Sequence, residues 1–397
     1  MGLRSHIRRL LPVKGFQFSR PLVLFHTDDW GLVGIRDQEG FDDLISRGVD
    51  LGSGPYDFYS LETAEDLRRL FGILLHHRDS IGRPPCLVFN FIVANVDFPR
   101  VADSGFTKLN LLPLDQGLPS RWRRPGLLET YRDGIQKGFI YPALHGLTHF
   151  CQISVEKVLQ RKDERSALLQ MLYSVDTPMI PERTPWVSFE YRHGLNGEKD
   201  AWLDFSSQRQ FIGEGKRLFE RVFGRAPFSA CAPGYRANED TLRGWAEAGI
   251  HVAQNGPGWD LAPYFDQNGL LHLHRNIPFE PFTDANQFDE KYALAKAEEM
   301  FKTGRPAIIC MHSINFHSTL KNYRDITLKI LDHFLTLLEA KYEDLLYVND
   351  FDLLEVIKSG YLEWDGERIP VPIRRRFEPS PSANYYLRKM GKRLTPC

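Results

Sequence analysis

The chain has 397 residues, is 42% hydrophobic and carries a formal net charge of −1. A charge so close to zero argues against a general nucleic-acid-binding protein, which would be clearly basic. The length is sufficient for one large α/β domain with insertions.

Short runs of β-branched and aromatic residues alternate with longer helical patterns, which predicts β/α units around a parallel sheet. We expect strands at Leu22–Thr27, Cys86–Val93, Ile140–His145, Phe228–Ala232, His251–Gln254, Leu271–Asn276, Ala307–His312 and Leu345–Val348. We expect helices at Ala64–His76, Val155–Tyr173, Gln208–Phe223, Asn238–Ala248, Asp289–Lys302 and Ile326–Glu339. About seven or eight such units favour a distorted (β/α)7-type barrel of parallel strands with irregular insertions.

The two ends and two internal stretches do not follow this pattern. Residues 1–20 form a basic extension and residues 361–397 a basic tail, so we expect one barrel domain over residues 21–360. Stretches 97–138 and 175–204 lack a clear period, which predicts cap insertions. The basic ends would suit peripheral contact with an anionic membrane, although solvated terminal charge is the commoner explanation.

The cysteines and the N-terminus indicate the compartment. Cys86, Cys151, Cys231, Cys310 and Cys397 are scattered and none has CxxC spacing, which favours reduced thiols over a disulfide framework. The basic start is not followed by an apolar stretch long enough for a signal peptide, and no run approaches the length of a membrane span. We therefore expect a cytoplasmic protein, and the oligomeric state stays open.

Polar residues follow several of the predicted strands. Asp28 and Asp29 come after the first strand, His145 and His149 after the third, and His312 after the seventh. The carboxyl ends of the strands meet at one face of a parallel barrel, so we expect these side chains to converge. An HxxxH pair alone is a weak signal, because a chain with 13 histidines contains one easily by chance; the joint placement after strands is the informative part.

The residue types at these positions indicate metal-assisted hydrolysis. Two histidines and one aspartate supply two neutral nitrogens and an anionic oxygen, a set that binds Zn²⁺ or a similar divalent ion and leaves a position for water. We expect Asp29, His145 and His149 to be these ligands. Asp28 would take the proton of the water and His312 would protonate the departing amine. The competing interpretations are a helix N-cap for the aspartates, loop positions for the histidine pair and a core position for His312.

In order and spacing, from about Leu22 to Val348, these segments resemble the NodB-homology polysaccharide deacetylases of carbohydrate esterase family 4. Thr27-Asp28-Asp29 is similar to the family's Thr-Phe-Asp-Asp motif, which implies that Asp28 is the catalytic base and Asp29 a metal ligand. His145 and His149 match the two ligands of its His-Ser/Thr-x-x-His motif, with Gly146 at the hydroxyl position.

The third and last motifs of the family are also present in part. Pro233-Gly234-Tyr235 is similar to its Pro-Pro-Tyr, but the arginine expected before it is absent and Arg236 follows instead. The resemblance implies that the backbone N–H of Tyr235 helps to stabilise an oxyanion. His312 after an apolar strand matches the last motif. We expect Pro233, Tyr235, Arg236 and Trp30 to contact the substrate. Stacking of Trp30 on a sugar ring is one interpretation, and packing in the core is the commoner role of an aromatic side chain at such a position.

Together these features predict metal-dependent hydrolysis of an N-acyl group, most simply N-acetyl, on an amino sugar. An intracellular saccharide precursor or an intermediate of surface-polysaccharide synthesis is the expected substrate. One alternative is deformylation of a lipid-linked amino sugar, because residues 229–238 are similar to deformylases of lipid-linked aminoarabinose. Another is a non-catalytic carbohydrate-binding protein of the same fold.

Overall fold

The computed structural model describes residues 12–194, 202–257, 261–283, 288 and 290–378. Its centre is a set of parallel strands that are neighbours in the order β12, β2, β3, β6, β7, β8 and β10. Their bounds are Ala307–His312, Leu22–Trp30, Leu87–Ile92, Ile140–Gly146, Ser229–Cys231, Val252–Asn255 and Leu271–His274. Each contains or overlaps a strand predicted from the sequence.

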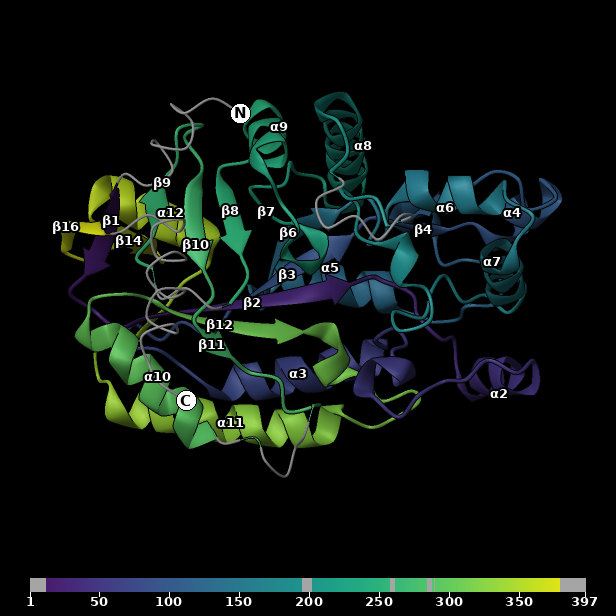
Figure 1. Cartoon of the computed structure of the whole chain (residues 1–397). Coiled ribbons are helices and arrows are strands. Elements are labelled where there is room, and N and C mark those ends of the chain that lie inside the picture. Colours follow the sequence, from purple (N-terminus) through teal and green to yellow (C-terminus); the bar gives the residue numbers. More distant parts are fainter. Residues whose placement is uncertain (1–11, 195–201, 258–260, 284–287, 289, 379–397) are drawn as a thin grey trace, which may run out of the picture.

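One continuous segment joins the two ends of this sheet. Strand β10 pairs with β8, and the chain then continues into β11 (Ile277–Pro278), which pairs with β12. The sheet therefore returns on itself, which confirms the predicted distorted α/β barrel (Figure 1). The eighth predicted strand is β13 (Leu346–Tyr347), which pairs with the start of β2, and β9 (Tyr264–Phe265) runs antiparallel to β10.

Most predicted helices are present to within a few residues: α3 (Ala64–His76), α8 (Phe205–Phe223), α9 (Glu239–Glu247), α10 (Glu290–Lys302) and α11 (Arg324–Lys341). The single helix predicted over Val155–Tyr173 is wrong. The chain forms α6 (Gln152–Leu159) and α7 (Glu164–Ser174), because Asp163 accepts a hydrogen bond from the Ser166 N–H and starts a second helix.

Other elements had no clear signal in the sequence. They are the helices α2 (Gln38–Ser46), α4 (Phe98–Asp103), α5 (Leu127–Gln136) and α12 (Asp350–Ser359), with the short strands β4 (Ala94–Val96) and β5 (Leu111–Pro113). Helices α4 and α5 lie in the stretch 97–138, which is therefore more regular than its composition predicts.

The barrel strands separate two cores because successive side chains point to opposite faces. On β2, Val23 and Phe25 belong to the large apolar cluster that includes the surrounding helices. Leu22 and Leu24 belong instead to a second cluster with residues of the other strands, such as Val88 of β3. The next residues of that inward row are His26 and Asp28, so the barrel interior changes from apolar to polar toward the carboxyl ends.

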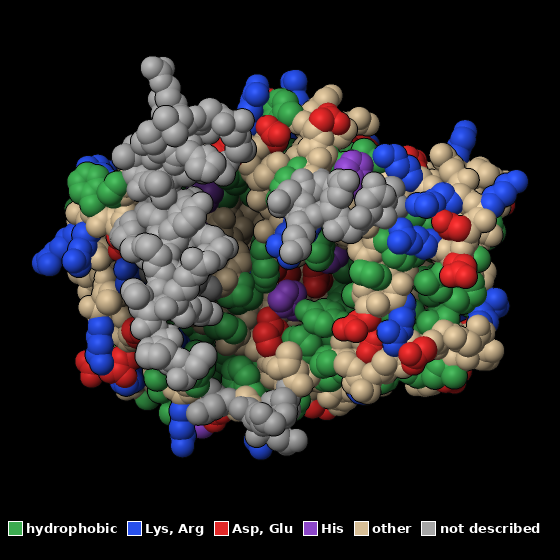
Figure 2. All heavy atoms as spheres, viewed as in Figure 1, with side chains coloured by type: hydrophobic (Ala, Val, Ile, Leu, Met, Phe, Trp, Pro, Cys, Tyr) green, Lys and Arg blue, Asp and Glu red, His purple; other side chains and the backbone are tan. Residues whose placement is uncertain are grey.

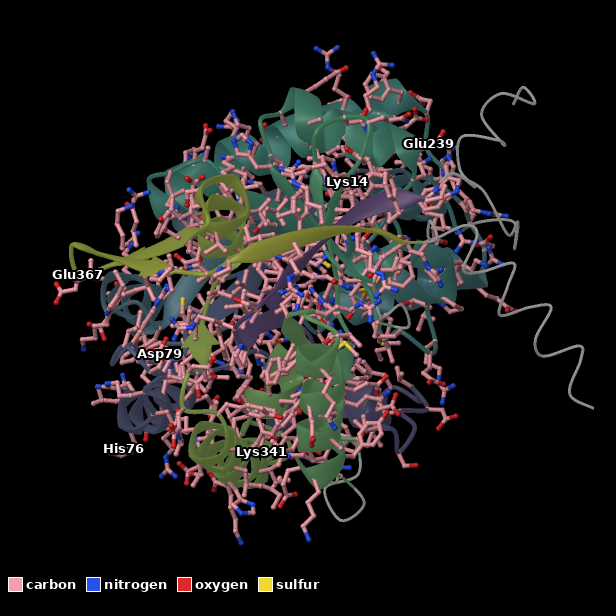
Figure 3. The ribbon with its side chains drawn as sticks, turned by 90° about the vertical axis from the view of Figure 1, so that its left-hand side faces the viewer. Lys14, His76, Asp79, Glu239, Lys341 and Glu367 are labelled. Atoms are coloured by element: carbon pink, nitrogen blue, oxygen red, sulfur yellow. The ribbon has the colours of Figure 1, made fainter. Side chains whose placement is uncertain are left out.

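The two terminal segments pair with each other at the amino end of the barrel. Strand β1 (Val13–Phe18) is antiparallel to β16 (Ile373–Glu378), and β14 (Tyr361–Trp364) forms a hairpin with β15 (Glu367–Pro370). Figure 3 shows this end of the molecule, with Lys14 on β1 and Glu367 at the hairpin. The division into extension, barrel domain and tail stays a prediction. Among the described residues, none of the helices has the length and apolar character to span a bilayer.

Candidate active site

Asp29 ends strand β2 in a backbone conformation that few residues adopt. Its φ is 71°, in the left-handed region that aspartate and asparagine tolerate better than most side chains. Its carbonyl oxygen accepts a hydrogen bond from the Tyr59 hydroxyl at 2.9 Å and lies 3.3 Å from the Ser313 hydroxyl. Such local strain, held in place by neighbouring groups, is typical of functional sites.

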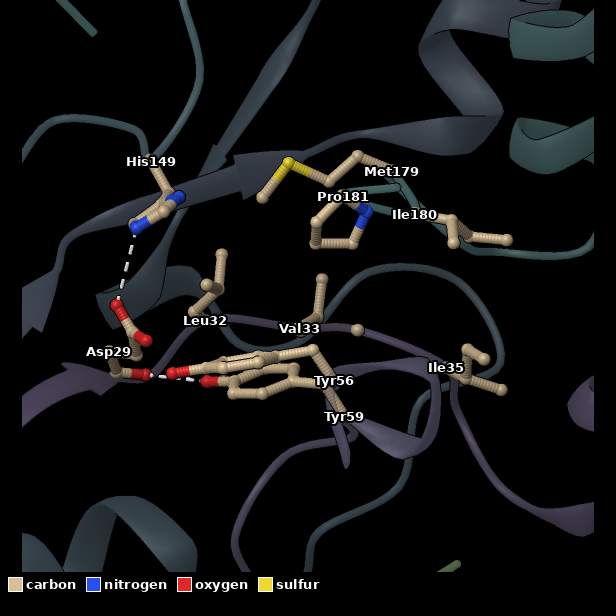
Figure 4. Close-up of a pocket in the computed structure, with 11 residues that line it drawn as sticks. Asp29, Leu32, Val33, Ile35, Tyr56, Tyr59, His149, Met179, Ile180 and Pro181 are labelled. Atoms are coloured by element: carbon tan, nitrogen blue, oxygen red, sulfur yellow. Dashed lines mark hydrogen bonds and ion pairs between the residues drawn. The ribbon is translucent and has the colours of Figure 1, made fainter. Parts of the chain in front are cut away.

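The predicted metal ligands lie together. Oδ1 of Asp29 is 3.1 Å from Nε2 of His145 and 3.3 Å from Nε2 of His149, and Figure 4 shows the approach of His149 to Asp29. Nδ1 of His145 is 2.9 Å from the carbonyl oxygen of Cys231, so it donates there and leaves Nε2 as the free lone pair. Two imidazoles and one carboxylate in this orientation fit a divalent ion of the zinc type.

A second cluster, Asp28 with His145 and Cys231, also brings three possible ligand atoms close together. The guanidinium of Arg275 contacts two members of this cluster. Its Nη2 lies 3.3 Å from Cys231 Sγ and its Nη1 lies 2.5 Å from Asp28 Oδ2. Burial raises the pKa of the Cys231 thiol, which favours the protonated form. A fixed positive charge opposes a cation at this point, so the Asp29 set is the better candidate.

The loop between the two histidines is braced by a side chain that the motif comparison missed. Glu190 Oε1 accepts hydrogen bonds from the backbone N–H groups of Leu147, at 2.7 Å, and Thr148, at 3.0 Å. Gly146 has a φ of 124°, and a Cβ atom there would clash with Oε2 of Glu190. Position 146 therefore requires glycine while Glu190, from the stretch 175–204, braces this loop.

Asp28 is buried and accepts hydrogen bonds from Arg275 and Asn90. Arg275 donates to both of its carboxylate oxygens, at 2.5 and 2.7 Å, and the Asn90 amide donates to Oδ1 at 2.8 Å. Burial by itself would raise the pKa of Asp28, but the Arg275 guanidinium holds it well below its usual range. Asp28 is therefore an anion at neutral pH.

His312 faces Asp28 across the site. Its Nε2 lies 3.9 Å from Asp28 Oδ2, and its Nδ1 is 2.6 Å from Oε1 of Glu280. The other Glu280 oxygen accepts from the Asn315 amide at 2.6 Å, which fixes the carboxylate. Burial lowers the pKa of His312, but Glu280 and the two site aspartates outweigh it and raise the pKa to about 9. His312 is therefore a cation at neutral pH, as a general acid requires.

The residues of the third motif, Pro233 to Tyr235, have other contacts than the ones predicted from the sequence. The backbone N–H of Tyr235 donates to the Ala232 carbonyl at 2.8 Å, so in this structure it does not point to an oxyanion as the motif implied. The Tyr235 ring lies beside His312, and its hydroxyl accepts from Arg275 at 2.9 Å. Pro233 is buried in the turn and offers no surface to a substrate. Arg236 is exposed, with its guanidinium over the Phe189 ring.

Trp30 is a core residue, so the predicted contact of its ring with a sugar is wrong. Its side chain is 0% exposed, and its ring stacks on Phe89 at 3.6 Å and lies near Phe316 on the other side. Its indole N–H donates to the Thr27 hydroxyl at 2.7 Å. Both ring faces and the polar atom are thus already in contact with the protein.

The face of the molecule seen in Figure 1 is hollowed. Figure 2 shows this hollow from the same side, with histidine and acidic side chains visible in it. Histidine and carboxylate groups at the bottom of a hollow, at the carboxyl ends of barrel strands, are where a substrate would reach them.

No protein-family model matches the chain, and no curated protein matches it in sequence. A polysaccharide deacetylase candidate from Mycobacterium smegmatis is 14% identical with a TM-score of 0.46, and the match covers 85% of this chain and 90% of that one. A probable polysaccharide deacetylase from Pseudomonas aeruginosa PAO1 is 11% identical with a TM-score of 0.46, covering 86% and 92%. Puue allantoinase is 11% identical with a TM-score of 0.46, covering 85% and 89%. Polysaccharide deacetylases are among the solved structures to which this chain is similar.

Proposed function

We propose that the protein is a metal-dependent amidase that removes an N-acyl group from an amino sugar. The observation that supports it most is the pairing of two arrangements at one face. Asp29, His145 and His149 lie close enough together to hold a divalent ion, and an anionic Asp28 lies opposite a cationic His312. A protein that only binds carbohydrate has no need of an acid and a base placed in this way.

The chemistry divides between the ion and the side chains. A bound divalent ion would polarise the amide carbonyl and make the attacking water more acidic. Asp28, kept ionised by Arg275, accepts the proton of this water as its oxygen adds to the carbonyl carbon. His312 gives its proton to the amine nitrogen as the C–N bond breaks, so that a carboxylic acid and an amine leave the site. Glu280 keeps His312 protonated for this step.

The sugar part of the proposal comes from the sequence motifs, which resemble enzymes acting on amino sugars. The exposed Arg236 next to the site would suit an anionic substituent, such as the phosphate of a nucleotide-linked or lipid-linked sugar. The cytoplasmic location and a role in the synthesis of surface polysaccharide are part of the same proposal.

The test combines metal analysis with release of the acyl group. Protein purified without chelator is analysed for bound metal and assayed on N-acylated amino sugars, together with Asp28→Asn and a matched surface variant, Asp133→Asn. Asp133, on α5, is 45% exposed and pairs with Lys137. We expect Asp28→Asn to lose activity by about 10²–10⁴-fold while it retains the metal, and Asp133→Asn to behave as wild type. Equal release by wild type and Asp28→Asn would contradict the proposal.

A further inference from the structure

An apolar slot lies directly beside the candidate metal ligands. Figure 4 shows Asp29 and His149 at one end of it, with the rings of Tyr56 and Tyr59 along one side. The rest of its wall is aliphatic. These wall residues include Leu32, Val33, Ile35, Met179, Ile180 and Pro181.

The two ends of the slot differ in polarity. At the ligand end are the imidazole of His149 and the carboxylate of Asp29, and the Tyr59 hydroxyl donates to the Asp29 carbonyl oxygen at 2.9 Å. Figure 4 shows Ile35 and Ile180 at the opposite end. A ligand with a polar group at the metal and a hydrocarbon tail fits this gradient. A sugar ring does not, because its hydroxyl groups would be buried without hydrogen-bond partners.

The volume of the slot is larger than an acetyl group requires. It measures about 70 Å³. One water-sized group needs about 10–15 Å³ of such space, so the slot has room for on the order of five of them. An acetyl group has a single methyl beyond its carbonyl, and a formyl group has none. Either would leave most of the apolar wall uncovered.

We propose that this slot binds the alkyl chain of the substrate's acyl group, and that this group has about four to six carbons rather than two. The inference depends on the proposed function, since it places the acyl carbonyl at the metal ligands and the amine near His312. Two chain segments form the aliphatic part of the wall. Residues 32–35 follow the ligand Asp29, and residues 179–181 belong to the stretch 175–204 that the sequence predicted as a cap insertion.

One measurement follows turnover. Glucosamine carrying N-formyl, N-acetyl, N-propionyl, N-butyryl, N-hexanoyl or N-decanoyl groups is offered to the zinc-loaded protein, and the free amine is quantified. A methylene in an apolar pocket improves kcat/KM by about 10-fold or more. We expect kcat/KM to rise from acetyl to butyryl or hexanoyl and to fall at decanoyl. A maximum at acetyl or formyl would overturn the inference and leave the proposed function intact.

A second measurement needs no turnover. The binding of straight-chain carboxylates, from formate to octanoate, to the zinc-loaded protein is measured by calorimetry. We expect affinity to increase about fourfold for each methylene until the slot is filled. Affinity independent of chain length would contradict the slot even if the protein hydrolyses amides. A rising series without hydrolysis of any N-acyl sugar would support the slot and contradict the proposed function.

Met179 allows the slot to be changed in both directions. It is partly exposed at the roof, so Met179→Trp narrows the slot and Met179→Ala widens it without disturbing the barrel. We expect the preferred chain to shorten in the first variant and to lengthen in the second. Ile45→Trp, at a 51% exposed position on α2, is the matched control and should leave the chain-length profile unchanged. Identical profiles in both Met179 variants, with folding confirmed by thermal melts, would overturn the proposal.

Discussion

Arg275 donates hydrogen bonds to both carboxylate oxygens of Asp28, although Asp28 and Arg275 lie 247 positions apart in the sequence. Both side chains are buried, so the pair is not screened by solvent as a surface ion pair would be. Leaving one charge of a buried pair without its partner is strongly destabilising. This pair therefore connects the stability of the barrel interior to the charge state of the proposed base.

Removal of Arg275 should change both stability and the pH profile. We expect Arg275→Met to lower the free energy of unfolding by about 3–5 kcal/mol, because Asp28 stays buried without its cation. Since Arg275 lowers the pKa of Asp28, its loss should raise that pKa and move the acidic limb of kcat/KM to higher pH. Arg275→Lys keeps a charge and should fold better with a smaller shift. Arg69→Met, at a 53% exposed position, is the control; an unchanged acidic limb in both Arg275 variants would show that Asp28 is not the base.

Glu280 should determine the pH at which kcat/KM falls on the basic side, because it contacts His312. His312 is protonated at neutral pH because Glu280 raises its pKa to about 9 against the opposing effect of burial. In Glu280→Gln this carboxylate is absent, so the pKa of His312 should fall and activity should be lost at lower pH than in wild type. The pH dependence of kcat/KM measures the shift. A basic limb that does not move would mean that His312 is not the acid.

The sequence predicts the barrel strands and the proximity of Asp29, His145 and His149 well, and it predicts the residues that support them poorly. Apolar runs are local features, and the ligands follow from the rule that strand ends carry the site. Arg275 lies on a predicted strand two residues from the inward-facing Leu273, so the alternation of side chains indicates that it also points inward. The local sequence does not indicate that it contacts Asp28. Glu190 and Glu280 lie in irregular segments, where no periodicity indicates which way a side chain points. Trp30 next to the site was misplaced because a motif position does not show whether a ring faces solvent or core.

Metal binding should stabilise the protein through His149. A ligand that binds the folded state alone raises the free energy of unfolding by about 2.7 kcal/mol when present at one hundred times its Kd. We expect Zn²⁺ to raise the Tm of wild type and to have little effect on His149→Ala. His333→Ala removes a 53% exposed histidine that pairs with Glu290 on α10, and it should respond to Zn²⁺ as wild type does. A Tm increase of equal size in His149→Ala would place the ion elsewhere.

The histidine loop offers a test in which the residue of the deacetylase motif should be harmful. Gly146→Ser introduces the hydroxyl residue of the His-Ser/Thr-x-x-His motif, yet it places a side chain at a φ of 124° and a Cβ atom in a clash with Oε2 of Glu190. Backbone strain of this kind costs about 1–3 kcal/mol. Displacement of Glu190 would also release the N–H groups of Leu147 and Thr148 and loosen the loop that carries His149. We therefore expect a lower Tm together with weaker Zn²⁺ binding. Gly213→Ser, on the exposed side of α8 with open space around it, should change neither. If Gly146→Ser retained full stability and metal affinity, the bracing of this loop by Glu190 would not be what excludes a side chain at position 146.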